Sequence, residues 1–536
     1  MQSIFVLSTL ISGLTTRAMY KIIALFALFV LPTFLFGQYP NITIYSTNHP
    51  SEPSICINPD NLDELVAGSN LNYVYTSNDG GYNWESNQLY SSEHGVWGDP
   101  CIVCDTAGDF YYFHLSNPSV GSWIDRIVCQ KTTDLGQNWS DGVGIGLNGV
   151  KAQDKEWSVV DRKNNNIYVT WTQFDSYGSP DTEDISLIRF AKSTDGGQSF
   201  SDPVRINDVH GDCIDDDNTV EGAVPAIGPN GEIYVSWAGP EGLVFDRSTD
   251  QGETWLDEDV FVGDFPSGWN YNIPGINRCN GLPVTVCDTS NSAYRGTIYI
   301  NWTDQRNGED DTDVWISKST DGGNSWSEAI RVNDDDEGKQ QFFTWMTIDQ
   351  TTGFLYFVFY DRRNYDDNNT DVYMAISKDG GDSFTNFKIS ESPFVPYESV
   401  FFGDYTNVTA HNGVVRPIWA RLNQNVLSIM TAIIDPEIIN VDNNEYQPFV
   451  LEQNYPNPFS DQTFISFKLY SPSVITLEIN DVFGTPIVTI LDQQDIEPGK
   501  HSYSFDADKY NLTSGVYYFS LRMNDQTMKR KMVYVN

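Results

Sequence analysis

Short runs that alternate apolar and polar residues recur along the chain from about residue 39 to residue 435. A representative run is Val314-Trp-Ile-Ser-Lys-Ser319. Runs of this length that are rich in β-branched and aromatic residues are typical of strands with a buried face. The pattern therefore predicts an all-β fold for this part of the chain.

The predicted strands repeat in groups of four. The first strand of a group has the form Pro-x-Val/Ile-x-x-Asp, the second resembles Ile-Tyr-Val-x-Trp, the third leads into a turn, and the fourth leaves it. The last group, Phe402–Ile434, has three strands, and we expect Ile42–Ser46 to supply its outer strand, because closure into a ring removes exposed sheet edges. First strands begin near Pro53, Pro100, Trp157, Val224, Pro283, Trp345 and Phe402.

Six copies of one octamer, Ser/Thr-x-Asp-x-Gly-x-x-Trp/Phe, occupy the turns after third strands. In such turns Asp and Ser/Thr side chains bond to nearby backbone N–H groups, and Gly supplies a positive φ. The aromatic residue at the eighth position can then fold back as an apolar plug. The copies are Ser77–Trp84, Thr132–Trp139, Ser193–Phe200, Ser248–Trp255, Ser319–Trp326 and Ser377–Phe384. Self-similarity of this kind indicates a repeat architecture.

These octamers resemble the Asp-box (bacterial neuraminidase) repeats of sialidase-like β-propellers. The resemblance implies that residues 39–435 form a β-propeller with each box between the third and fourth strand of a blade, remote from the catalytic face. It gives the box aspartates a structural role: Asp79, Asp134, Asp195, Asp250, Asp321 and Asp379. Seven groups of strands favour seven blades; the alternative is six, the number in sialidases proper.

The composition changes after a polar linker at residues 436–448. The segment 449–536 opens with Leu451-Glu-Gln-Asn-Tyr-Pro-Asn-Pro-Phe459 and continues with strands at Leu477–Val482 and Gly515–Phe519, a turn at Phe483-Gly484, and a basic end at Lys529–Lys531. This order resembles the C-terminal sorting domain of the type IX (Por) secretion system. The resemblance implies a small β-sandwich, recognition by the secretion machinery, and a secreted or outer-membrane cell-surface location in a Gram-negative bacterium. The alternative is an ordinary small β-sandwich used for binding.

The N-terminal residues 1–37 are interpreted as a signal peptide, with Met19 as the true start. A basic start at Met19–Lys21 precedes the apolar run Ile22–Phe36, which is too short and too close to the terminus to be a membrane span. We therefore expect no membrane span in the mature protein.

The acidic composition limits the partners of the chain. Asp and Glu outnumber Lys and Arg by 73 to 31, which gives a net charge of −42. Nucleic-acid binding requires a basic footprint, so no nucleic-acid partner is expected.

The seven cysteines are an odd number for an exported protein. Cys101 and Cys104 are interpreted as buried thiols, and Cys213 and Cys279, both in long loops, as the candidate disulfide.

Candidate site residues follow from the strand pattern. In a propeller, the loops that enter the first strands and the loops that follow the second strands build one face of the central channel. Polar residues there include Asp99, Asp154, Glu156, Asp175, Glu221, Arg278, Asp304, Arg306, Arg362, Arg363 and Asp404 beside Tyr405.

The sialidase resemblance implies roles for some of them. That family uses an arginine triad for the substrate carboxylate, a Tyr nucleophile activated by a Glu, and an Asp as acid/base, roles that suit guanidinium forks and buried carboxylic acids. The substrate-binding candidates are Arg278, Arg306, Arg362 and Arg363, and the catalytic candidates are Asp99, Glu221, Asp404 and Tyr405, with Tyr360 as the alternative tyrosine. The family's Arg-Ile-Pro motif is absent, and each arginine could instead pair with a neighbouring Asp.

No cofactor is expected. The acidic clusters Asp212–Asp217 and Asn333–Glu337 offer oxygen ligands suited to Ca²⁺, but neither reproduces an EF-hand loop. No pair of histidines has the H-x-x-x-H spacing of a zinc enzyme.

Three functions are compatible with the sequence. The first is a sialidase-like glycoside hydrolase that acts on extracellular glycans. The second is a non-catalytic propeller that binds glycan or protein. The third is a polysaccharide lyase, in which His94 or His411 would act with a tyrosine.

Overall fold

The computed structural model describes residues 39–216, 218–423, 425–435, 449–469, 472–481, 485–510, 512–523 and 526–535. The predicted signal peptide, the linker at 436–448 and the Phe483-Gly484 turn lie outside the described residues. The described residues confirm the all-β prediction: apart from one 3₁₀ turn at Asp508–Tyr510, they form strands and loops. None of them belongs to a helix long and apolar enough to cross a membrane.

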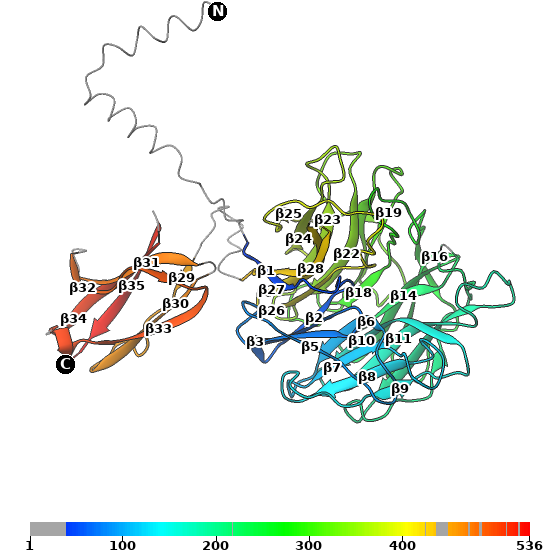
Figure 1. Ribbon diagram of the computed structural model, residues 1–536, viewed down its shortest axis with the longest axis horizontal. Helices are drawn as coiled ribbons and strands as arrows, with labels where there is room; N and C mark the ends of the chain where they lie inside the picture. Colours follow the sequence, from blue (N-terminus) through cyan, green and yellow to red (C-terminus); the bar gives the residue numbers. More distant parts are fainter. Residues whose placement is uncertain are drawn as a thin grey trace, which may run out of the picture. The chain divides into compact units, whose positions relative to one another are not determined.

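Between residues 39 and 435 the described residues form seven four-stranded antiparallel sheets (Figure 1). Six sheets take their strands in chain order. They contain β2 (Ser54–Asn58), β3 (Asn61–Ser69), β4 (Tyr73–Ser77) and β5 (Glu85–Gln88); β6 (Gly98–Cys104), β7 (Phe110–Leu115), β8 (Ile127–Thr132) and β9 (Val143–Ile145); and β10 (Ala152–Asp161), β11 (Asn166–Phe174), β12 (Ser186–Ser193) and β13 (Val204–Arg205). The next three contain β14 (Glu221–Ile227), β15 (Ile233–Gly239), β16 (Gly242–Ser248) and β17 (Val260–Gly263); β18 (Val284–Cys287), β19 (Ile298–Asp304), β20 (Asp313–Ser319) and β21 (Ile330–Arg331); and β22 (Gln341–Ile348), β23 (Leu355–Asp361), β24 (Asp371–Ser377) and β25 (Thr385–Lys388).

The seventh sheet joins the two ends of this region. It contains β26 (Asn407–His411), β27 (Val414–Asn423) and β28 (Val426–Ala432), and its fourth strand is β1 (Asn41–Tyr45). β1 pairs antiparallel with β28, with Asn41 opposite Ala432. The outer strand that the last group lacked is thus supplied from the N-terminal side, as expected. The first strands of successive sheets contact one another, and β26 contacts β2.

Several first strands begin with a bulge that has a left-handed residue. The register shifts between Gly98 and Cys101, between Asp154 and Trp157, between Glu221 and Val224, and between Phe342 and Trp345. Within three of these bulges a residue other than glycine has positive φ: Asp99 (54°), Lys155 (52°) and Phe343 (51°). Such φ values are uncommon outside glycine, and a bulge redirects the side chains beside it.

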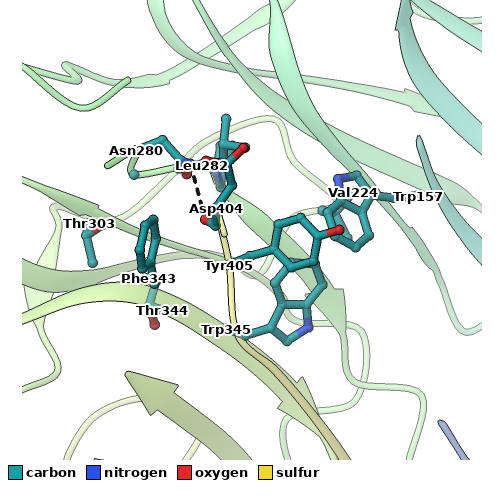
Figure 2. Close-up of a pocket in the computed structure, with 12 residues that line it drawn as sticks. Trp157, Val224, Asn280, Leu282, Thr303, Phe343, Thr344, Trp345, Asp404 and Tyr405 are labelled. Atoms are coloured by element: carbon teal, nitrogen blue, oxygen red, sulfur yellow. Dashed lines mark hydrogen bonds between the residues drawn. The ribbon is translucent and has the colours of Figure 1, made fainter. Parts of the chain in front are cut away.

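The middle of the channel is filled with aromatic side chains (Figure 2). The rings of Trp157 and Trp345 lie 4.6 Å apart, and Tyr405 lies 5.0 Å from Trp157 and 6.1 Å from Trp345, measured between ring centroids. The space left among these side chains is about 10 Å³, which is no more than one water molecule requires. We call these three residues the aromatic plug.

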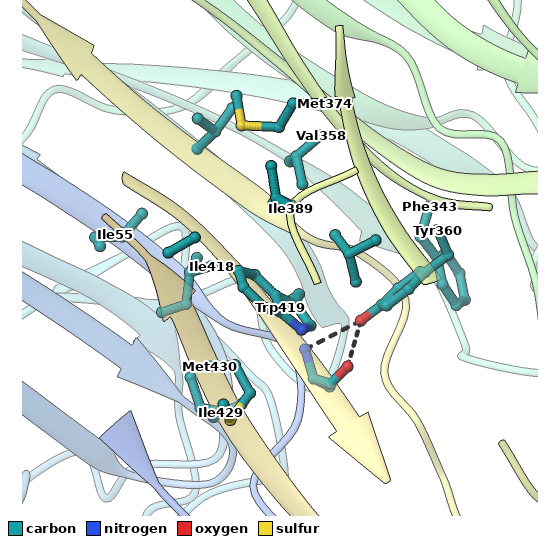
Figure 3. Packing of buried hydrophobic residues seen from close by; sticks show 14 of the residues in the cluster. Ile55, Phe343, Val358, Tyr360, Met374, Ile389, Ile418, Trp419, Ile429 and Met430 are labelled. Atoms are coloured by element: carbon teal, nitrogen blue, oxygen red, sulfur yellow. Dashed lines mark hydrogen bonds between the residues drawn. The ribbon is translucent and has the colours of Figure 1, made fainter. Parts of the chain in front are cut away.

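A large apolar cluster packs the last sheet against its neighbours (Figure 3). Trp419 is fully buried in it, as is Tyr360. The Tyr360 hydroxyl donates to the Ala420 carbonyl (2.8 Å) and accepts from the Ala420 N–H (3.0 Å). The Tyr360 hydroxyl is therefore buried and bonded to the backbone, so Tyr360 is not available as the alternative nucleophile.

The six octamers lie between the third and fourth strands of their sheets. In the copy that follows β20, the Ser319 hydroxyl accepts from the Gly323 N–H (2.8 Å) and donates to the Asp321 carboxylate (2.8 Å). Asp321 also accepts from the Ser325 N–H (3.0 Å). Trp326 packs on Phe245 of the preceding sheet, 5.1 Å between ring centroids. The turn thus closes a hairpin and also joins two sheets.

The C-terminal residues form two further sheets. One contains β29 (Phe449–Leu451), β30 (Gln462–Leu469) and β33 (Gly499–Asp506); the other contains β31 (Ser473–Asn480), β32 (Pro486–Ile496), β34 (Gly515–Met523) and β35 (Gln526–Tyr534). Side chains of both sheets share one apolar core, which includes Phe467, Leu477 and Phe519. This is the two-sheet packing of a small β-sandwich.

The octamer turns yield a prediction about stability. Ser319→Ala removes a buried hydroxyl that makes three hydrogen bonds within the turn, so we expect the free energy of unfolding to fall by about 1–2 kcal/mol. Chemical denaturation followed by tryptophan fluorescence measures this change. Ser325→Ala removes an exposed hydroxyl from the same turn and should cost less; an equal or greater cost would contradict the role of the buried serine.

Candidate functional site

A cavity of about 570 Å³ opens where the first strands begin. Its floor is built by the bulges of β6 and β10 and by the residues just before β2. Its walls come from connecting loops. Residues that line it include Asn48, His49, Glu52, Asn70, Asn72, Tyr73, Gln88, Trp97, Asp99, Trp123, Asp154, Lys155, Tyr177, Arg278 and Phe401. We call it the mouth cavity.

Lys155 is the central charge of the floor. Its Nζ lies 2.9 Å from an Asp99 oxygen and 3.0 Å from an Asp404 oxygen, and its side chain is 5% exposed. The bulge also lets its backbone N–H donate to the Asp154 carboxylate (2.9 Å). Lys155 therefore holds three carboxyl groups, Asp99 and Asp404 through its ammonium and Asp154 through its backbone N–H.

Arg278 is the second cation of the mouth cavity. Its Nε donates to Asp404 (3.0 Å), and its Nη2 bonds to the other oxygen of the same carboxylate, which makes a bidentate pair. Its Nη1 donates to Asp215 (2.7 Å), which also accepts from the Tyr177 hydroxyl (2.8 Å). The guanidinium is thus shared between two carboxylates.

Carboxyl groups outnumber cations here, and their pKa values diverge accordingly. Burial opposes ionisation of Asp404, but Lys155 and Arg278 outweigh it and hold the pKa of this carboxyl well below its usual value. Burial, followed by repulsion from Asp99 and Asp215, raises the pKa of Asp154 to about 7 despite Lys155. Burial and neighbouring carboxylates raise the pKa values of Glu52 and Glu221 well above the usual range. The floor therefore combines one carboxyl group whose pKa is lowered with others whose pKa values are raised, an arrangement found at catalytic sites.

One wall of the mouth cavity is aromatic. Trp97 meets Trp123 edge to face with 5.8 Å between ring centroids, and Trp123 meets Tyr177 at 5.9 Å. Trp123 is 46% exposed, although large aromatic side chains are usually well buried. An exposed indole beside a polar cavity offers an apolar face to a ligand.

The structure brings together some of the predicted site residues. Asp99 and Arg278 line the mouth cavity, and Asp404 lies directly beneath them as the partner of both cations. Glu221 is fully buried close to Asp215 and Asp154, and burial, followed by repulsion from these two carboxyls, raises its pKa. Tyr405 belongs to the aromatic plug below the floor, and burial raises its pKa well above the usual value.

The structure does not bring the predicted arginines together. Arg306 pairs with Asp304 and lies over the Trp315 ring, 4.5 Å from its centroid. Arg362 donates to Gln340, Thr370 and the Pro274 carbonyl, and Arg363 pairs with Asp361 and Asp334. Each of these arginines neutralises or braces its own loop, and the expected convergence on one carboxylate-binding point is not seen.

The remaining candidates lie elsewhere. His411 lines a different cavity of about 420 Å³ at the far ends of the first strands, and His94 is buried beside Gly144.

Cys213 and Cys279 are free thiols, as are the other five cysteines. The predicted disulfide is wrong because each of the two packs into a different apolar cluster. Among the described residues, no group of three or more His, Cys, Asp or Glu side chains is placed to hold a metal ion.

Sequence reasoning missed Lys155, Glu52 and the aromatic wall. The available signal was positional: Asp99 and Lys155 lie in the bulges near the starts of β6 and β10, and Glu52 lies two residues before β2. All three have positive φ. A charged residue near the start of the first strand in three repeats marks the ring of side chains that faces the cavity.

The floor yields a prediction about stability and its pH dependence. Lys155→Met leaves buried Asp99 and Asp404 without their shared cation, so we expect a loss of about 3–5 kcal/mol at neutral pH. The loss should shrink as the pH falls, because Lys155 helps to hold the pKa of Asp404 low, and the stability gained in this way is itself lost when Asp404 takes up a proton. Urea titrations at several pH values measure both effects. Lys151→Met, which breaks a more exposed pair with Asp175, is the matched control and should cost at most about 1 kcal/mol; equal losses would contradict the assignment.

Comparison with known proteins gives one sequence match and several structural similarities. Residues 453–536 match the family described as the secretion system C-terminal sorting domain. No curated protein sequence matches the chain.

Solved structures with similar folds include three carbohydrate-active proteins. A Hadza microbial sialidase is 15% identical, with 71% of this chain and 75% of that chain covered and a TM-score of 0.41. The intramolecular trans-sialidase of Ruminococcus gnavus is 10% identical, with 66% and 98% covered and a TM-score of 0.41. An ulvan lyase, described as a new family of polysaccharide lyase, is 12% identical, with 73% and 95% covered and a TM-score of 0.44. Identities this low leave the activity of this chain to be argued from its own site.

Proposed function

We propose that the chain is an exported β-propeller of seven blades that hydrolyses glycosidic bonds in the mouth cavity. The observation that carries the proposal is the pair of carboxyl groups on neighbouring first strands, Asp154 and Asp99, beneath an exposed aromatic wall. Seven sheets with cyclic contacts between their first strands support the seven-bladed ring. The sorting domain supports export by the type IX machinery, to the medium or the cell surface.

The two carboxyl groups have the properties that glycoside hydrolysis needs. Asp154, with its pKa raised to about 7, carries a proton in mildly acidic solution and can deliver it to the leaving glycosidic oxygen. Asp99, paired with Lys155, is the carboxylate that can stabilise the positive charge developing on the sugar ring. Trp123 offers a stacking face for the sugar, and Asn48, Asn72 and Gln88 offer amide groups for its hydroxyls.

The proposal predicts a defined pH profile. The rate should fall as the pH rises through about 7, because Asp154 loses the proton that it must donate. Asp154→Asn should lower kcat at least about 10²-fold and abolish this limb. The assay is release of 4-nitrophenol from a panel of aryl glycosides, together with reducing-sugar release from polysaccharides.

Asp175→Asn is the control for this experiment, because Asp175 pairs with Lys151 and does not line the mouth cavity. It should retain the wild-type rate and pH profile. Wild-type rate and profile in Asp154→Asn would overturn the assignment of the acid.

Non-catalytic glycan binding is the second candidate. The observation that favours it is that both cations of the floor are already paired with carboxylates of the protein. Saturable binding to a glycan array without release of sugar from any substrate would support it.

The aromatic wall yields a prediction common to both candidates. Trp123→Ala removes the exposed stacking face, so the affinity for a bound glycan should fall about tenfold or more, equivalent to about 1.4 kcal/mol. Tyr90→Ala, a change at a residue that is 76% exposed and does not line the cavity, should leave the affinity unchanged. Isothermal titration with a glycan identified on the array measures both; equal effects would contradict the role of the wall.

A further inference from the structure

We propose that the mouth cavity takes uncharged or amino-bearing sugar residues and rejects carboxylated and sulfated ones, with Asp215 as a specificity-determining residue. This inference rests on the proposed function, because it concerns the substrate of the same cavity. It departs from what the sialidase resemblance implies, a binding site for a sugar carboxylate.

The balance of charges carries the first step. Six carboxyl side chains lie on or directly beneath the floor, and two cationic side chains lie among them. The carboxyls are Glu52, Asp99, Asp154, Asp215, Glu221 and Asp404, and the cations are Lys155 and Arg278. Glu52, Asp154 and Glu221, whose pKa values are raised, contribute little negative charge in mildly acidic solution. The other three carboxylates still outnumber the two cations, so an anionic ligand would meet a net negative charge in a partly desolvated site, where repulsion between like charges is costly.

The state of Arg278 carries the second step. Binding a carboxylate or sulfate calls for a guanidinium fork that faces the ligand with free N–H groups. Arg278 already uses Nε and Nη2 on Asp404 and Nη1 on Asp215. Its side chain is 32% exposed, so it reaches the cavity, but its positive charge is already shared between Asp404 and Asp215.

Lys155 offers no alternative point of attachment for an anion. Its ammonium is held between Asp99 and Asp404 and is 5% exposed. Arg306, Arg362 and Arg363 do not line the cavity. The groups left to a ligand are His49 and the amides and aromatic faces of the walls, which suit sugar hydroxyls, and the carboxyls of the floor, which suit an ammonium group.

Asp215 is the group that can be changed with least damage. Its side chain is 14% exposed, and its carboxylate joins Arg278 to the Tyr177 hydroxyl. Asp215→Asn keeps an oxygen that can accept hydrogen bonds but removes the negative charge. Lys155 and Arg278 would then be balanced by Asp99 and Asp404 alone, so the floor would lose its excess of negative charge beside Arg278.

The test uses the full chain and matched probes. A glycan array carrying neutral, amino-bearing, carboxylated and sulfated glycans is read with wild type, Asp215→Asn and Asp215→Ser, after thermal melts show that the variants are folded. Wild type should bind neutral or amino-bearing glycans at least tenfold better than matched carboxylated or sulfated ones. Both variants should reduce that preference at least tenfold, whereas Asp175→Asn should preserve it.

The outcomes separate this inference from the proposed function. Stronger binding of carboxylated or sulfated glycans by wild type, or no binding of any neutral or amino-bearing glycan, overturns the inference even if glycosides are hydrolysed. An unchanged preference in both folded variants removes Asp215 as its determinant. Selective binding of neutral glycans without hydrolysis upholds the inference and rejects the hydrolase.

Discussion

The structure of residues 39–435 depends on the pairing of β1 with β28. Each four-stranded sheet buries its faces against its neighbours, so an array with two free ends would leave the first and last sheets half covered. β1 arrives from the N-terminal side and completes the sheet that ends the array, and β26 then contacts β2. With the ends joined, every first strand is held at a fixed place around one channel. The positions of Asp99, Lys155 and Asp404 relative to one another follow from that closure.

The mouth cavity is also shaped by the cost of burying charge. Lys155 and Arg278 are tolerated in the floor because carboxylates surround them. Burial raises the pKa values of Glu52, Asp154 and Glu221, which favours their uncharged form. The bulges that place these groups require left-handed residues at Asp99 and Lys155, a backbone arrangement that only firm surrounding packing maintains. The aromatic plug supplies that packing directly below. Charge, backbone and core thus depend on one another in this small region.

The sequence predicted the strands, the octamer turns and the strand that joins the two ends, because these depend on local alternation and turn chemistry. It also placed Asp99, Arg278 and Asp404 near the channel, since residues before first strands must face it. It could not tell which arginines converge, because Arg306 and Arg363 each lie two residues from an aspartate that captures them. Lys155 was not predicted because its neighbours in the sequence do not mark it. Its partners are Asp99, which lies 56 positions earlier, and Asp404, which lies on the other side of the channel. Pairing over such separations is set by the fold.

The aromatic plug (Trp157, Trp345 and Tyr405) determines how a ligand can enter and leave the central channel. These three side chains separate the mouth cavity from the cavity of about 420 Å³ at the opposite ends of the first strands, which His411 lines. A polymer therefore cannot pass between the two cavities, and a ligand must enter and leave the mouth cavity through the same opening. Such a cul-de-sac accommodates the tip of a chain or a side branch and leaves the remainder outside. For the glycoside hydrolysis that we propose, this shape favours cleavage at chain ends over cleavage along the middle of a polysaccharide.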